Sequence, residues 1–190
     1  MIPACENMIS SKAMKPGDII ASMNGKYIEV VNTDAEGRMA LADAITYAIR
    51  ECGATAVIDV ATLTGACEVA LGSRYTGVFS NSDDLVAKLV QASILAGENI
   101  WRMPMGDDEY KDLNASSVAD IANCGTQCGA IAAARFLNEF VERKPWIHMD
   151  IAGTSDSDAD TEIYSKGGTG VSAMTLYEFV KLMEKPYKSY

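Results

Sequence analysis

Two hydrophobic patterns alternate along this chain. In residues 54–63 nearly every position is apolar and many are β-branched, which is typical of a strand that is covered on both faces. In residues 39–51 the apolar positions recur at helical spacing, which predicts a helix with one buried face. Further strands are predicted at 76–80 and 146–152, and further helices at 66–73, 85–96, 107–112, 130–143 and 171–183.

A β-hairpin is predicted before the first of these helices. Residues 18–23 and 26–31 flank Asn24-Gly25, a pair that favours a type I′ turn. The second arm runs directly into the polar stretch 32–38, which the helix at 39–51 follows. Strand, helix and the strand at 54–63 in this order predict a βαβ unit with a right-handed crossover.

The order of these elements indicates the fold class. The sequence has no internal repeat and no linker, so we expect one α/β domain over residues 1–190. We expect three layers, with a mainly parallel or mixed central sheet that helices flank. With 190 residues, of which 48% are apolar, the chain is long enough to bury a substantial core.

Composition narrows the classes of function. The net charge of −10 argues against a nucleic-acid partner, because phosphates require a basic face. No apolar run reaches the length of a membrane span. The single histidine, His148, excludes metal sites built mainly from imidazoles. Because His148 falls in an apolar strand, we expect it to be a structural residue.

The cysteines indicate a compartment. There are five, an odd number without regular spacing, so we expect free thiols in a reducing environment and a cytoplasmic protein. They are Cys5, Cys52, Cys67, Cys124 and Cys128. The last two lack the second pair that a zinc ribbon requires.

The stretch 32–38 carries the clearest candidate chemistry. Asp34 and Glu36 offer hard oxygen ligands for a divalent cation. Gly37 allows a tight turn, and Arg38 falls near a helix N-terminus, where an anion is favoured. The alternative is that both acids only cap the helix or occupy its first turn, as acids commonly do.

A second candidate segment follows the strand at 54–63. It reads Thr62-Leu63-Thr64-Gly65, and small or hydroxyl residues at a strand end allow a ligand to approach the backbone. The alternative is an ordinary loop.

Five motifs together resemble the leucyl aminopeptidase (cytosol aminopeptidase) family. The resemblance extends over residues 14–182 and therefore covers nearly the whole chain. The motifs are NTDAEGRMA at 32–40, DVATLTGA at 59–66, VADIANCG at 118–125, HMDIAGT at 148–154 and KGGTGVSAMTLYEFV at 166–180. The first of these resembles the signature of the family.

The resemblance implies roles for the polar stretch. Asp34 would bind a metal through its side chain and its backbone carbonyl, and Glu36 would bridge two divalent ions, manganese or zinc. Arg38 would hold a bicarbonate ion that serves as the general base. The implied reaction is two-metal-assisted amide hydrolysis that releases the N-terminal amino acid of a peptide.

The resemblance also implies substrate contacts. Thr62, Leu63 and Gly65 would line the cleft and grip the peptide through backbone groups, and Ala152 would lie in the pocket for the N-terminal side chain. Ser155 stands where family members often have a bulkier apolar residue, so a preference for leucine does not follow.

The resemblance is to the C-terminal half of the family's catalytic domain. The lysine and further aspartate ligands of the family belong to upstream segments, so we expect this fragment to be incomplete and inactive by itself. Family members are hexamers that act on peptides, and we expect a homo-oligomer without nucleic-acid or membrane partners. The alternative is a non-catalytic binding or structural module with the peptidase fold.

Overall fold

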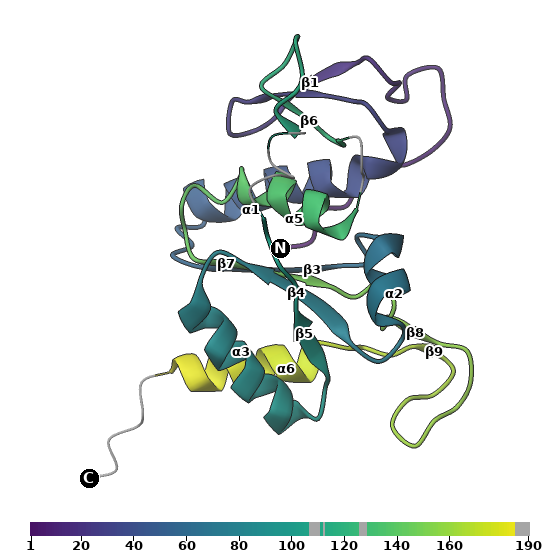
Figure 1. Ribbon diagram of the computed structural model, residues 1–190, viewed down its shortest axis with the longest axis vertical. Coiled ribbons are helices and arrows are strands. Elements are labelled where there is room, and N and C mark those ends of the chain that lie inside the picture. Colours follow the sequence, from purple (N-terminus) through teal and green to yellow (C-terminus); the bar gives the residue numbers. More distant parts are fainter. Residues whose placement is uncertain (107–110, 112, 126–128, 185–190) are drawn as a thin grey trace. The chain divides into compact units, whose positions relative to one another are not determined.

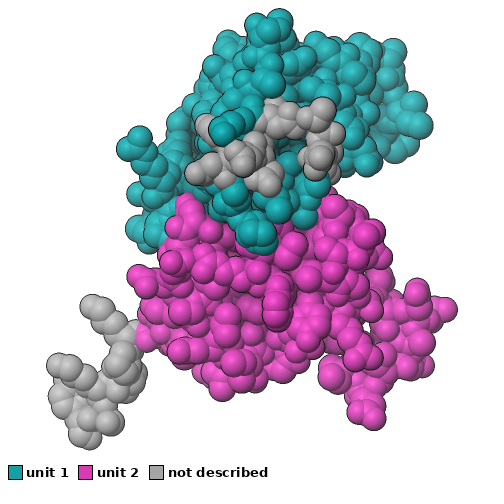
Figure 2. All heavy atoms as spheres, in the orientation of Figure 1, with its two compact units in different colours: residues 1–59, 104–146 teal, residues 60–103, 147–190 magenta. Residues whose placement is uncertain are grey.

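The chain forms two compact units. The computed structural model describes residues 1–106, 111, 113–125 and 129–184 (Figure 1). Unit 1 comprises Met1–Asp59 and Pro104–Trp146, and unit 2 comprises Val60–Met103 and Ile147–Tyr190 (Figure 2). One domain over residues 1–190 remains a prediction, and each unit is described by itself below.

Unit 1 contains a small mixed sheet. Strands β1 (Ile19–Ala21) and β2 (Tyr27–Glu29) form the predicted antiparallel hairpin, and β2 pairs in parallel with β6 (Ile121–Ala122). The expected type I′ turn is wrong. It would need positive φ at Asn24 as well as at Gly25, but only Gly25 has it, at 94°.

Two helices pack against each other in unit 1. A 3₁₀ turn, η1 (Thr33–Ala35), leads into α1 (Glu36–Arg50), which packs against α5 (Ala130–Asn138). Both helices bury apolar side chains, and their burial stabilises unit 1. The buried residues include Ala42, Ile45, Ile49, Ala133, Phe136 and Leu137.

A four-stranded sheet has the order β3-β7-β4-β5. Its strands are β3 (Val57–Ala61), β4 (Thr76–Ser80), β5 (Ile100–Arg102) and β7 (Trp146–Asp150). Strand β4 pairs in parallel with β5 and antiparallel with β7. Both β4 and β7 are buried throughout, whereas β3 lies at the sheet edge and only its central Asp59 is buried. The expectation that β3 is covered on both faces is therefore wrong.

The predicted βαβ unit is also wrong. Strands β2 and β3 flank α1 in sequence but belong to different sheets, because β2 pairs with β6. The α/β class is nevertheless confirmed, with mixed sheets of the predicted kind.

Unit 2 has a helix pair of its own. Helix α3 (Asp83–Ala96) packs against α6 (Ala173–Met183), and Figure 1 shows them side by side. Ser82 caps α3 by accepting from the N–H of Leu85, and Gly97 ends it in a left-handed conformation. The remaining elements are α2 (Gly65–Leu71) and the hairpin of β8 (Asp156–Ser157) and β9 (Gly167–Gly168).

The cysteines differ from the prediction at one position. Cys5 and Cys52 are exposed free thiols and Cys67 is a buried one, but Cys124 is disulfide-bonded. Cys128 lies outside the described residues. So does the predicted helix at 107–112, except for residue 111. No helix within the described part of the chain is both long and apolar enough to cross a bilayer.

Candidate functional site

The acidic turn 32–38 connects β2 to α1. Asn32 is the N-cap of η1, and its side chain accepts a 2.9 Å hydrogen bond from the N–H of Asp34. Helix α1 begins at Glu36, and its N-cap residue Ala35 provides no side-chain cap. Neither acid is therefore an N-cap, because Asn32 caps η1 and Ala35 is the N-cap of α1. Both acids occupy first-turn positions of their helices.

The two carboxylates are available to a ligand. Asp34 is exposed, and its side chain forms no hydrogen bond or ion pair with the described residues. Glu36 is half-buried and accepts one long hydrogen bond, 3.5 Å, from Asn7. Such carboxylate oxygens suit a hard divalent cation. The two acids can supply only part of a donor set, because among the described residues no group of three His, Cys, Asp or Glu is arranged to hold a metal.

Arg38 lies in the interior of unit 1. It is 3% exposed, and its Nη1 donates a 2.9 Å hydrogen bond to the backbone carbonyl of Asn123. A guanidinium has five N–H donors in a rigid fork, which suits it to hold a planar anion. The role of Arg38 towards bicarbonate remains a prediction.

Asn123 organises the turn, and sequence reasoning missed it. Its side-chain oxygen accepts from the N–H groups of Val31 (2.9 Å) and Asn32 (3.2 Å), and its amide donates to the carbonyl of Asn32 (2.7 Å). Its own N–H donates to the carbonyl of Glu29. Asn123 is completely buried. The motif at 118–125 contains it, but nothing in that motif indicates its partners.

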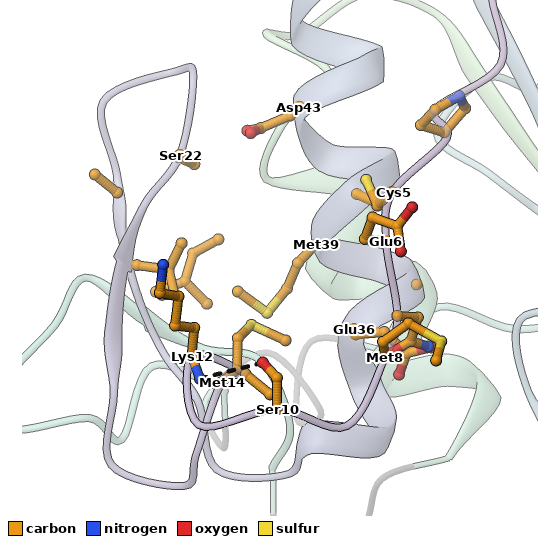
Figure 3. Close-up of a pocket in the computed structure, with 18 residues that line it drawn as sticks. Cys5, Glu6, Met8, Ser10, Lys12, Met14, Ser22, Glu36, Met39 and Asp43 are labelled. Carbon is orange, nitrogen blue, oxygen red and sulfur yellow. Dashed lines mark hydrogen bonds between the residues drawn. The ribbon is translucent and has the colours of Figure 1, made fainter.

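A cavity of about 610 Å³ borders the turn within unit 1. It is lined by the N-terminal segment, the β1–β2 hairpin and one side of α1 (Figure 3). Its lining residues include methionines 8, 14 and 39 and the acids Glu6, Glu36 and Asp43. Asp34 and Arg38 are not among the lining residues. The cavity therefore reaches only one member of the predicted metal pair.

The predicted substrate segment belongs to unit 2. Thr62 and Gly65 are exposed, and Leu63 is half-buried. Thr64 is buried and caps α2, because its Oγ1 accepts a 3.1 Å hydrogen bond from the N–H of Cys67. A Cβ added at Gly65 would meet no atom within 4 Å. The surface at Gly65 is thus open to a ligand.

Asp150 brings this segment together with Ala152. One oxygen of its carboxylate, Oδ1, accepts from the N–H groups of Leu63 (3.2 Å), Thr64 (3.4 Å) and Ala152 (3.2 Å). The other, Oδ2, accepts a 2.6 Å bond from the hydroxyl of Thr64. Asp150 is 1% exposed. Sequence reasoning missed it too, although the motif at 148–154 contains it.

His148 has the structural character that its strand predicted. It is completely buried in β7, and its ring stacks on Phe79 at a centroid distance of 6.0 Å. Ser155 lies in the turn that follows β7, where its N–H donates to the carbonyl of Ile151. The structure thus gathers the candidates into two groups, one within each unit.

Comparison with known proteins decides the family. The model of the cytosol aminopeptidase family, catalytic domain, matches residues 1–177. The chain belongs to the cytosol aminopeptidase family. The resemblance noted in the sequence is therefore confirmed.

Relatives in the cytosol aminopeptidase family show how much of a full-length protein this chain represents. It is 55% identical over 186 residues to the "probable cytosol aminopeptidase" of Alkaliphilus oremlandii, covering 97% of this chain and 37% of that protein. The corresponding protein of a Picosynechococcus species is 52% identical over 178 residues, 93% of this chain and 36% of its own length. The chain thus spans little more than a third of these relatives.

A solved structure gives the same result for the fold. A mutant of tomato leucine aminopeptidase matches with a TM-score of 0.86 and 49% identity, over 93% of this chain and 34% of the tomato chain. The α/β elements described above therefore match those of the tomato protein over most of this chain.

Proposed function

We propose that this chain carries part of the catalytic machinery of a metal-dependent aminopeptidase, which releases N-terminal amino acids from peptides. The observation that supports this most directly is the acidic turn. Among the described residues, the carboxylates of Asp34 and Glu36 have one hydrogen bond, from Asn7 to Glu36. The chain that presents them belongs to the cytosol aminopeptidase family. We propose a cytoplasmic location for the protein. For its assembly we propose a homo-oligomer, hexameric as in the family.

Each group of residues then has its own task. Asp34 and Glu36 would hold two divalent cations, manganese or zinc, which when bound supply Lewis-acid chemistry for amide hydrolysis. Arg38 would hold bicarbonate as the general base through its guanidinium. Thr62, Leu63 and Gly65 would bind the peptide through backbone groups, with Ala152 beside its N-terminal side chain.

We also infer that the chain by itself does not complete a two-metal site. Two carboxylates rarely hold a cation tightly, since high affinity requires more charged ligands. The described residues add no third acid, histidine or cysteine to the pair. The chain alone is therefore expected to bind manganese weakly and to be inactive.

A calorimetric titration tests the metal proposal. Manganese added to the full chain should bind with a Kd above about 100 µM, as expected for a site with few charged ligands. The variant Glu36→Ala should abolish that binding, whereas Glu51→Ala, at the other end of α1, should leave it unchanged. Tight stoichiometric binding to the chain alone would contradict the incomplete site.

A chimera tests the activity. Residues 1–177 would replace the matching segment of the Alkaliphilus oremlandii relative, and hydrolysis of a leucyl amide would be measured with manganese. We expect turnover that Glu36→Ala removes and Glu51→Ala retains. A folded, assembled chimera without turnover would instead favour a non-catalytic binding or structural module.

A further inference from the structure

Asp150 is a buried carboxylate whose hydrogen-bond donors among the described residues are all neutral. It ends β7 and is 1% exposed. Three backbone N–H groups and one hydroxyl donate to it. Burying a carboxylate is costly unless its oxygens are hydrogen-bonded. The residues that donate these hydrogen bonds indicate why a carboxylate is buried at this position.

These partners are the predicted substrate residues and their neighbour. Leu63 and Thr64 precede α2, and they lie 87 and 86 positions from Asp150 in sequence. Ala152 follows β7 in the next turn. The carboxylate therefore joins two separate loops of unit 2 through hydrogen bonds to a charged acceptor, which are stronger than those between neutral groups.

The hydrogen bonds continue into α2. The Thr64 hydroxyl donates to Asp150 over 2.6 Å and accepts from the N–H of Cys67 over 3.1 Å. Because consecutive N–H groups at Leu63 and Thr64 both point to Asp150, the peptide planes of this segment are held in one orientation. The exposed groups at Thr62 and Gly65, on either side, are oriented as a result.

We propose that Asp150 is a positioning residue for peptide binding. It does not contact the peptide itself, and it orients the segment 62–65 relative to Ala152 so that both can. This inference rests on the proposed function, since it takes these residues as the peptide-binding ones. The positioning and the binding can be measured separately.

The test uses the full chain and the dipeptide leucyl-glycine. Hydrogen exchange of the Leu63 and Ala152 amides reports the positioning, and an NMR titration that follows the Gly65 amide reports dipeptide binding. Urea unfolding of each variant reports global stability. Asp150→Ala should speed exchange at both amides and weaken dipeptide binding, each by about tenfold or more, as expected when hydrogen bonds to a charged group are lost.

Matched variants separate positioning from stability. Asp59 accepts a 2.6 Å hydrogen bond from Trp146 and is also buried, so Asp59→Asn should lower stability without affecting the amides of the segment. Thr64→Val should weaken binding, and Thr64→Ser, which keeps the hydroxyl, should restore it. Should Asp150→Ala fail to fold, Asp150→Asn and Thr64→Val provide the same comparison.

Two negative results have different meanings. A wild-type chain that does not bind the dipeptide would overturn the proposed function of the segment. A wild-type chain that binds it, together with Asp150 variants that retain affinity and amide protection, would overturn the positioning role. The positioning role would also be overturned if Asp150 and Asp59 variants of equal stability lost dipeptide affinity and amide protection to the same extent.

Discussion

The side chain of Asn123 forms a two-point hydrogen bond with the backbone of Asn32. Its Oδ1 accepts from the Asn32 N–H over 3.2 Å, and its Nδ2 donates to the Asn32 carbonyl over 2.7 Å. An amide side chain thereby pairs with a peptide group much as a neighbouring strand would. This pairing anchors the residue from which the acidic turn begins.

Replacing Asn123 should loosen that turn. Asn123→Ala removes the partners of two backbone N–H groups and one carbonyl, so we expect a loss of about 2 kcal/mol in the free energy of unfolding. Urea denaturation measures this loss, with the exposed Asn99→Ala as the control. Hydrogen exchange should rise at Val31 and Asn32; unchanged exchange there would contradict the anchoring role.

Two glycines of unit 2 should respond oppositely to alanine. A Cβ at Gly153 would overlap the carbonyl oxygen of Gly72 and lie 3.3 Å from the Cα of Glu68, so Gly153→Ala should cost about 2 kcal/mol or more. Gly65→Ala meets no neighbour and should fold like the wild type. Thermal unfolding compares the two variants. If Gly65 lies against the peptide, Gly65→Ala should weaken dipeptide binding while stability remains unchanged.

Cys67 should be the unreactive thiol among the free cysteines. Burial, with a smaller contribution from the charge of Asp150, raises the pKa of Cys67 from its ordinary 9.0 to about 11. At pH 8 iodoacetamide should therefore modify the exposed Cys5 and Cys52 and leave Cys67 intact, because only the thiolate reacts. Peptide mass spectrometry identifies the modified residues.

The same shift predicts a pH dependence of stability. A raised pKa in the folded state favours the protonated thiol, so the contribution of Cys67 is complete below pH 9.0 and is lost as the pH rises towards about 11. The variant Cys67→Ala should lack this component of the alkaline decrease. Equal decreases in both proteins would show that the Cys67 thiol does not contribute.

Glu98 should stabilise α6 from outside that helix. Its carboxylate accepts from the N–H groups of Ser172 and Thr175, each at 3.0 Å, at a helix start where Ser172 provides no side-chain cap. Glu98→Ala should therefore cost about 2 kcal/mol, and Glu98→Gln about half of that, since it keeps one acceptor. Chemical denaturation tests this, with the exposed Glu162→Ala as the control.

Local chemistry explains which elements were predictable. Strand β4 has the predicted bounds, and α3 begins after Ser82 and ends before Gly97, because strand pattern and capping depend on residues close in sequence. The βαβ unit was wrong for the opposite reason. Hydrophobic pattern shows that a strand has a buried face, but it does not show which strand pairs with it, and β2 pairs with β6.

The candidate site divides in the same way. The types and spacing of Asp34, Glu36 and Arg38 were sufficient to find the acidic turn. Asn123 and Asp150 could not be found, because a buried amide and a buried carboxylate are recognised only by their partners. Those partners lie 91 positions from Asn123 at Asn32 and 86 positions from Asp150 at Thr64.

The amino-acid sequence by itself determined the α/β class, most of the helices and strands, the family and the acidic turn, since each depends on short-range pattern or on motif identity. The tertiary structure alone decided how strands pair, that Arg38 is buried, and which residues hold the two candidate segments in place. These features depend on hydrogen bonds and burial between residues far apart in the chain, which exist only after folding has brought them together.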